Sequence, residues 1–151
     1  MEITVREIRL GDERRISEIH FRHNSFFEED YVSPDFISEC LAGGDFNFLV
    51  AESGGEIAGF CGMLYHLHVG RAEIGPIAVE DGFKGRGVGR ILLEKAFDLL
   101  KEIGVLRVIV KVKAENSGAL GFFQNQGFTP EGRFENYTRT GDSVVQMVRF
   151  I

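Results

Sequence analysis

The feature that most constrains this chain is a basic, glycine-rich loop near its middle. Four glycines, at positions 82, 85, 87 and 89, lie between an apolar stretch that predicts a strand and one that predicts a helix, and Lys84, Arg86 and Arg90 add three positive charges. The first N–H groups of a helix have no partner within it, and glycine lets an anion approach them closely. We therefore expect this loop to bind a phosphate-bearing ligand, rather than to be only a tight turn.

Two common phosphate-binding motifs do not fit the loop. A nucleoside-triphosphate loop needs GxxxxGK[ST], but Gly82 and Gly87 are followed by Val88 and Gly89, so the Lys and the Mg²⁺-binding hydroxyl are missing. A dinucleotide fingerprint needs GxGxxG, and the third glycine would fall at position 90, which is Arg. A nucleotide-binding regulator is therefore kept only as the least favoured class of function.

The hydrophobic pattern around the loop predicts a mixed α/β fold. Proline cannot donate a ladder hydrogen bond, so we expect a bulge or splayed edge at Gly75-Pro76. Three consecutive strands followed by alternation with helices predict a mixed sheet with helices on its faces. The expected strands span residues 3–8, 46–50, 56–69, 71–79, 105–112, 128–137 and 143–150, and the expected helices span 12–23, 33–41, 88–103 and 117–125. The expected helix caps are Asp12, Ser33 and Asn116-Ser117. The apolar stripe expected for the helix over 88–103 is Val88, Leu92, Ala96, Leu99 and Ile103.

Composition and length exclude several classes of protein. With 151 residues, 44% of them hydrophobic, we expect one globular domain over 1–151. The sequence shows no secretory signal and no run of roughly 18 apolar residues, so we expect a cytoplasmic protein without a membrane partner. A formal charge of −6 disfavours a nucleic-acid partner. Cys40 and Cys61 predict two reduced thiols and no metal site.

The charge is unevenly distributed. Residues 1–60 hold 5 Arg and 13 acidic residues, giving −8, whereas residues 61–151 hold 12 basic and 10 acidic residues, giving +2. The acidic first half could attract a cationic partner and the second half an anion, with ordinary solvated surface as the alternative.

The loop and its neighbours resemble the acyl-CoA-binding motif of the GNAT superfamily of N-acyltransferases. That signature is Gln or Arg, two residues, Gly, one residue, then Gly or Ala, and here it is KGRGVG over 84–89, with Lys84 retaining the charge. Residues 72–79 resemble the family's splayed fourth strand, and 116–128 resemble its second motif. The resemblance covers nearly the whole chain and implies a mostly antiparallel mixed sheet, splayed after the fourth strand, with helices on both faces.

The resemblance also implies which residues bind acetyl-CoA. The backbone of Ile77 and Val79 is expected to hold the pantetheine arm of the cofactor and to polarise the thioester carbonyl. The backbone amides of residues 86–89 are expected to hold the pyrophosphate. Asn116 is expected to contact the pantetheine arm. The full expected set is Ile77, Ala78, Val79, Lys84, Gly85, Arg86, Gly87, Val88, Gly89, Arg90, Asn116, Phe122 and Phe123.

The expected catalytic residues are Glu73 and Tyr137. Many members of the family have a tyrosine that protonates the leaving thiolate where this chain has Phe123, so Tyr137 or a water is expected to substitute, unless Tyr137 is an ordinary strand aromatic. A CoA thiol with a pKa near ~8.5 leaves with little help, so the substitution is compatible with catalysis. Glu73 is expected to accept the amine proton, with a solvent-facing strand carboxylate as the alternative.

The resemblance implies an enzyme that transfers an acetyl group from acetyl-CoA to a primary amine by direct attack and releases CoA. A non-catalytic acyl-CoA-binding module or sensor is the alternative. The acceptor is expected to be a small cationic amine or a protein N-terminus, held by Glu28, Glu29, Asp30 and Tyr31, with ordinary solvation of these carboxylates as the alternative. A homodimer is left open, because final strands and exposed aromatics form interfaces in many proteins. His66 and His68, two apart on the strand expected over 56–69, are expected to share a face; contact with a metal or the substrate is the alternative to an ordinary exposed strand, which is preferred because there is no third ligand.

Overall fold

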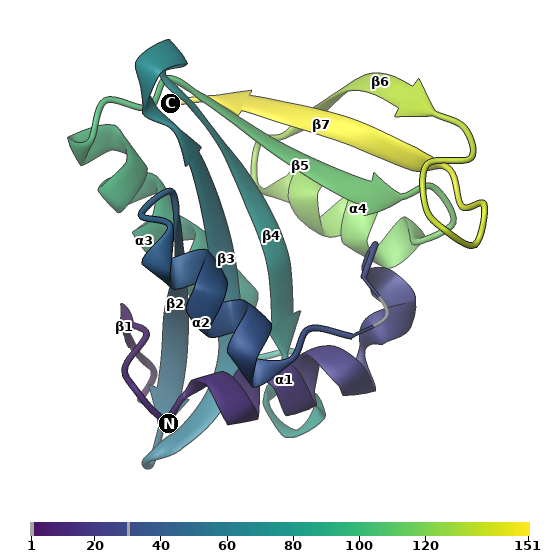
Figure 1. Cartoon of the computed structure of the whole chain (residues 1–151). Helices are drawn as coiled ribbons and strands as arrows, with labels where there is room; N and C mark the ends of the chain where they lie inside the picture. Colours follow the sequence, from purple (N-terminus) through teal and green to yellow (C-terminus); the bar gives the residue numbers. More distant parts are fainter. Residues whose placement is uncertain (1, 30) are drawn as a thin grey trace.

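The computed structural model describes residues 2–29 and 31–151, and the expected order of strands and helices is confirmed (Figure 1). The strands are β1 (Thr4–Glu7), β2 (Phe46–Ser53), β3 (Glu56–His66), β4 (Arg71–Val79), β5 (Arg107–Lys113), β6 (Thr129–Phe134) and β7 (Val144–Phe150). The helices are α1 (Glu13–Arg22), α2 (Pro34–Ala42), α3 (Val88–Glu102) and α4 (Ser117–Asn125), with short 3-10 turns at Asn24–Phe26, Leu67–Val69 and Asp81–Phe83.

The strands form one mixed sheet in the order β1-β2-β3-β4-β5-β7-β6. The pairing of β4 with β5 is parallel, and the other neighbours pair antiparallel. A parallel pair needs a crossover connection, and α3 provides it. The mostly antiparallel mixed sheet expected from the sequence is therefore confirmed.

The sheet splays between β4 and β5. Arg71 to Ile74 pair with Arg107 to Val110, but β4 continues to Val79 along β3 alone. The register of β3 against β4 shifts between Cys61 and Met63, opposite Gly75-Pro76, where the sequence predicts a bulge or splay. Figure 1 shows β4 and β5 diverging beyond this point, so one edge of residues 75–79 faces a gap instead of a described strand.

Helices cover both faces of the sheet. On one face, Leu92, Ala96 and Leu100 of α3 are fully buried against the sheet in the larger core cluster, which also contains Phe123 of α4. On the other face, Ile16 and Ile19 of α1 pack with residues of α2, β2 and β3 in a second cluster. Both α1 and α2 come from residues 1–60, so the first part of the chain covers this face of the sheet.

Three local predictions are wrong. The strand expected to reach residue 69 ends at His66, because a 3-10 turn follows, so His68 does not share a strand with it. The strand expected to reach Tyr137 ends at Phe134, since its partner β7 begins opposite it, at Val144. Asp12 does not cap α1 with its side chain, because that carboxylate accepts hydrogen bonds from Arg6 and from the backbone N–H of residue 9.

Over 88–103 the helix is confirmed, but its expected apolar stripe is partly wrong. The far end of the buried face is formed by Phe97 and Leu100, whereas Ile103 is 47% exposed.

Among residues 2–29 and 31–151, no group of His, Cys, Asp and Glu is arranged to hold a metal ion. Within the same ranges, none of the helices has the length and apolar character needed to cross a membrane.

Candidate active site

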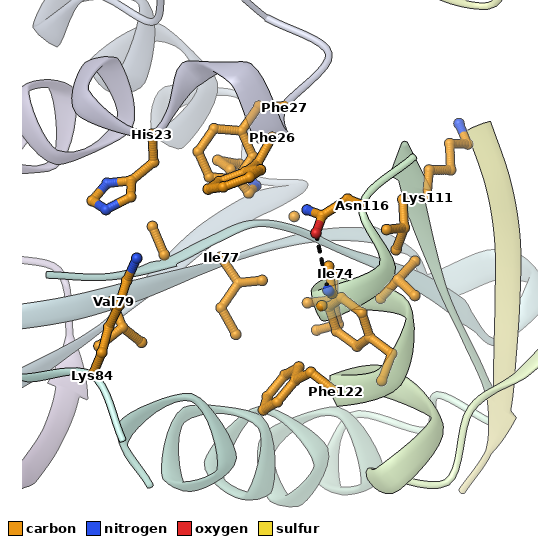
Figure 2. Close-up of a pocket in the computed structure, with 18 residues that line it drawn as sticks. His23, Phe26, Phe27, Ile74, Ile77, Val79, Lys84, Lys111, Asn116 and Phe122 are labelled. Atoms are coloured by element: carbon orange, nitrogen blue, oxygen red, sulfur yellow. Dashed lines mark hydrogen bonds between the residues drawn. The ribbon is translucent and has the colours of Figure 1, made fainter. Parts of the chain in front are cut away.

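A cavity of about 470 Å³ occupies the splay (Figure 2). It is lined by residues 74–79 of β4, by residues 110–112 of β5, by the first part of α4, and by Phe26 and Phe27 after α1. Its walls are mainly apolar and backbone, and Lys84, Lys111 and Asn116 stand at its edges. Of the residues expected to bind the cofactor, it is lined by Ile77, Ala78, Val79, Lys84, Asn116, Phe122 and Phe123.

A second cavity of about 500 Å³ extends the first toward the glycine-rich loop. Both cavities are lined by residues 77–79 of β4 and by Phe122 and Phe123 of α4, so together they form one groove. This second part is lined by Gly85, Gly87, Val88, Gly89 and Arg90. The guanidinium of Arg86 lies over the ring of Phe83, 5.9 Å from its centroid, and Arg86 is not a lining residue of the groove.

Glycine is favoured at two positions where the loop enters α3. Gly87 is the N-cap of the helix and has a φ of +78°, a conformation that L side chains rarely adopt. A Cβ at Gly89 would lie 3.1 Å from the Cζ atom of Phe122, so a side chain there would press this ring into the groove. The helix therefore presents its first N–H groups to the groove with little side-chain cover, as an anion site requires.

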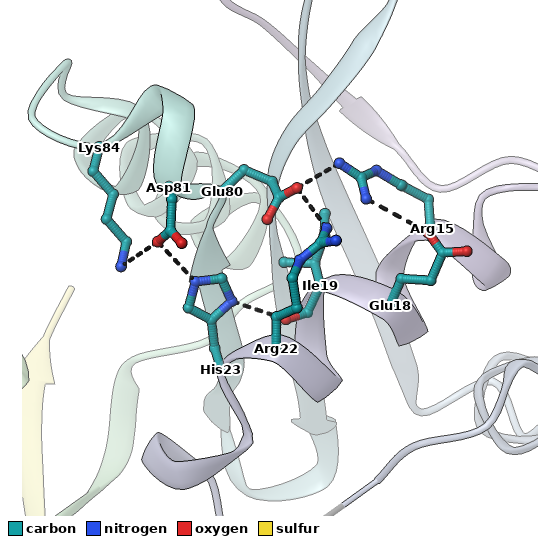
Figure 3. Close-up of polar contacts among 8 residues, drawn as sticks. All are labelled: Arg15, Glu18, Ile19, Arg22, His23, Glu80, Asp81 and Lys84. Carbon is teal, nitrogen blue, oxygen red and sulfur yellow. Dashed lines mark hydrogen bonds and ion pairs between the residues drawn. The ribbon is translucent and has the colours of Figure 1, made fainter.

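A polar network joins this loop to α1 (Figure 3). The Lys84 Nζ atom lies 3.0 Å from the Asp81 carboxylate, and the Nε2 atom of His23 lies 3.3 Å from the same oxygen. Hydrogen bonds to Lys84 and His23 hold the pKa of Asp81 below its usual value. Glu80 is paired with Arg22 at 2.6 Å and with Arg15.

The two polar atoms of the Asn116 side chain have different surroundings. Its side-chain oxygen accepts a hydrogen bond from the backbone N–H of Ala119 at 3.1 Å, which caps α4. Its amide nitrogen points toward the groove in Figure 2. Asn116 can therefore act as a donor to a carbonyl of a ligand, which suits the amide-rich pantetheine arm.

Among the described residues, no tyrosine lines the groove, and Phe123 stands where the family tyrosine is expected. Phe123 is buried, with its ring 5.2 Å from Phe122 and 5.4 Å from Phe128 between centroids. Tyr137 lies in the loop after β6 and lines neither part of the groove. Its ring centroid is 5.3 Å from the Nζ atom of Lys111, so it contacts the acceptor side through this lysine.

Carboxylates gather on the α1 side of the splay, around Lys111. The charged residues that line a small cavity there are Glu28, Glu29, Glu73, Lys111 and Lys113, and the Glu73 Oε1 atom lies 3.4 Å from the Lys111 Nζ atom. Burial raises the pKa of Glu28, and repulsion from Glu29 and Glu73 adds to this against the opposing effect of Lys111. Burial opposes the charged form of Lys111, yet contact with Tyr137 and attraction to Glu73 raise its pKa overall.

The structure brings together only part of the expected acceptor site. Glu28 and Glu29 line the cavity, whereas Tyr31 is 57% exposed, packs edge-on against Phe21, and lines no cavity of the site. Asp30 lies outside the described residues. The buried His20 side chain, 3.7 Å from Glu29, lowers the pKa of that carboxyl.

Sequence reasoning did not select Phe26, Phe27 or Lys111, and it noted His23 only as sharing a helix face with His20; all four line the groove. The alternation of Lys111 and Lys113 with apolar residues along β5 was an available signal for a charged face. No pattern in the sequence indicates the contacts of His23, because its partner Asp81 is 58 residues away along the chain.

The arrangement suits a ligand that carries both phosphate and a thioester. The helix N-terminus and Lys84 can hold a pyrophosphate, the open edge of β4 can bind an extended arm, and the carboxylates can receive a cationic amine at the other end. These features define an acyl-CoA-dependent acyltransferase.

The comparisons with known proteins agree with this class. The chain belongs to the acetyltransferase (GNAT) family, whose model matches residues 13–128. It is 31% identical, over 95% of its length and 92% of that protein's, to a Bacillus subtilis protein provisionally named as a [ribosomal protein bS18]-alanine N-acetyltransferase. It is 27% identical to the N-alpha-acetyltransferase RimI of Mycobacterium tuberculosis, over 97% of this chain and 91% of that protein.

The fold is also that of a solved structure, Ard1 from Thermoplasma volcanium. The TM-score is 0.88 at 23% identity, and the match covers 100% of this chain and 99% of the other. The protein is thus an N-acetyltransferase that uses acetyl-CoA and transfers the acetyl group to a primary amine.

Proposed function

We propose that the acceptor is the α-amino group of a peptide or protein N-terminus. The observation that carries this proposal is the pairing of Glu73 with Lys111, 3.4 Å apart, in the small cavity beside the groove. A lysine-like amine, with a pKa near ~10.4, needs a strong base, whereas an α-amine, near ~7.7, is partly neutral at pH 7. A carboxylate paired with a lysine is a weak base, so it suits the α-amine, which needs little help to lose its proton. Two relatives are named as alanine and N-alpha acetyltransferases.

In this proposal the residues of the chain divide the work along the groove. Lys84 and the backbone N–H groups of residues 87–89 hold the pyrophosphate, and Asn116 donates to the arm. When bound, acetyl-CoA supplies an acetyl thioester that is reactive toward a neutral amine. Glu73 accepts the proton that the amine loses, directly or through water, and backbone amides at Ile77 and Val79 favour negative charge on the carbonyl oxygen. Phe123 donates no proton, which is tolerable because a thiol has a pKa near ~8.5.

The test is a comparison of acceptors that differ only in their amine. A peptide with a free N-terminus, the same peptide blocked at the N-terminus and carrying one lysine, and spermidine are each mixed with enzyme and acetyl-CoA, and thiol release is measured. We expect turnover with the free N-terminus at least tenfold above the other two. Faster turnover of the lysine peptide or of spermidine would overturn the proposal. CoA binding without turnover of any acceptor would favour the acyl-CoA-binding module.

We further propose that residues 1–151 act as one catalytic domain in the cytoplasm, where the free thiols of Cys40 and Cys61 would stay reduced. A homodimer is supported by exposed apolar side chains, since Leu106 and Phe150 are 67% and 71% exposed. Light scattering of the purified protein tests this state.

A further inference from the structure

A third cavity lies beside the acceptor site, between α2 and the sheet. It has a volume of about 350 Å³, in the range of small ligand pockets. Its walls are apolar, and carboxylates stand at its mouth. The apolar lining is formed by Val32, Phe36, Ile37, Cys40, Phe46, Phe48 and Leu64, and the polar rim by Glu28, Glu29, Glu73 and Lys111.

This apolar cavity adjoins the groove. Gly75, Pro76 and Lys111 line the groove in the splay, the small acidic cavity and the apolar cavity alike. The place where an amine would meet the groove is therefore also the entrance of the apolar cavity. A molecule seated there can keep its amine among the carboxylates while its next group enters the cavity.

The charges at the entrance determine what kind of molecule fits. Three carboxylates surround one lysine, so the rim carries an excess of negative charge and favours a cationic amine over an anion. The cavity behind it favours an apolar group, because transfer of apolar surface out of water is favourable. The occupant is therefore an amine with an apolar group attached close to it.

We propose that the acceptor is a peptide N-terminus whose first side chain is large and apolar, such as leucine, methionine or phenylalanine. This inference rests on the proposed function and adds the residue class to it. The α-amine lies among Glu28, Glu29 and Glu73, and the first side chain occupies the apolar cavity. Alanine, whose methyl group would leave most of the cavity empty, is a poor acceptor, in contrast to the alanine specificity in the name of the Bacillus relative.

The size of the preference follows from the carbon count. Each buried methylene is worth about fourfold in binding, so leucine, with three more carbons than alanine, gains up to about 60-fold. Tetrapeptides that differ only at the first residue, with alanine, serine, methionine, leucine or phenylalanine, are compared by kcat/KM for thiol release. We expect the leucine, methionine and phenylalanine peptides to exceed alanine by at least tenfold.

A matched pair of variants tests whether this cavity sets the preference. Cys40→Phe places a ring in the wall of the cavity, and Ser38→Phe places the same ring on the exposed side of α2. We expect the leucine-to-alanine ratio of kcat/KM to fall below about 2 in Cys40→Phe and to stay above 10 in Ser38→Phe. Phe36→Ala, which removes a half-exposed part of the wall, lowers the ratio as well and serves if Cys40→Phe does not fold.

The outcomes separate the two proposals. If peptides are acetylated but alanine equals or exceeds leucine, or if Cys40→Phe leaves the ratio unchanged, the apolar-residue inference is overturned and the proposed function stands. If no peptide N-terminus is acetylated while lysine or spermidine is, the proposed function itself fails. Faster turnover of phenethylamine than of the phenylalanine peptide would show that a free amphipathic amine is the acceptor, and would also overturn the inference.

Discussion

The role of Glu73 as a base leads to a quantitative prediction about pH. Glu73→Gln keeps the size of the side chain and removes the negative charge that lies 3.4 Å from the Nζ atom of Lys111. The side chain of Glu73 is 24% exposed, so the replacement amide remains in contact with water and should not disturb β4. If Glu73 accepts the proton of the acceptor amine, the variant can use only amines that are already neutral in solution.

The neutral fraction sets the expected size of the defect. For an α-amine with a pKa near ~7.7, about 0.1 of the amine is neutral at pH 6.7 and about 0.9 at pH 8.7. General base catalysis contributes at least about 10²-fold, so we expect kcat/KM of Glu73→Gln to be about 100-fold below the wild type at pH 6.7. Over these two pH units the defect should shrink about tenfold, because the variant then finds the amine already deprotonated.

The assay is thiol release with a peptide that begins with leucine, measured between pH 6.5 and 9. Glu56→Gln, at an exposed position in the β2–β3 hairpin, is the matched control and should follow the wild type. CoA binding of Glu73→Gln should be unchanged. A defect of constant size across this range would refute the reasoning, since it would mean that Glu73 positions Lys111 or the acceptor without moving a proton.

Three further predictions concern other parts of the chain. Phe123→Tyr should change kcat by no more than about 100-fold, because the thiol is a good leaving group; an inactive wild type that gained activity in this variant would contradict this. Gly87→Ala, at a φ of +78°, should lower the free energy of unfolding in urea by about 1 kcal/mol or more, and Gly82→Ala, with open space around it, by less. Partial burial raises the pKa of Asp12, but a hydrogen bond from Arg6 lowers it overall. The stability that this gives above pH ~4 should therefore be lost as the pH falls through the folded pKa. In Asp12→Asn, the free energy of unfolding in urea should vary less with pH.

The parts of the fold that the sequence predicts well are those determined by neighbouring residues. Ser33 accepts a hydrogen bond from the backbone N–H of Phe36 and caps α2 as expected, because the cap and its donor are three residues apart. Asn116 caps α4 in the same way. The glycine-rich loop is local as well, and its place between a strand and a helix follows from adjacent hydrophobic patterns.

The acceptor side could be predicted only in part, because distant residues build it. The pairing of Glu73 with Lys111 depends on the parallel register of β4 and β5, which no short pattern encodes. The end of β6 is set by where β7 begins, so the sequence placed Tyr137 on a strand although it lies in a loop. The apolar cavity combines α2 with β2, β3 and β4, and the sequence identified only its acidic rim.

The splay has a consequence for the mechanics of the molecule. β4 and β5 share four registered residue pairs, whereas β5 and β7 share seven, so the line between β4 and β5 is a weak seam between two halves of the sheet. A ligand in the groove would contact β4 in one half of the sheet and α4, which lies next to the other half. It would therefore hold the two halves together across this seam. Ligand at 100 times its Kd would add about 2.7 kcal/mol to the stability of the folded chain. Resistance to unfolding is therefore coupled to the supply of acetyl-CoA.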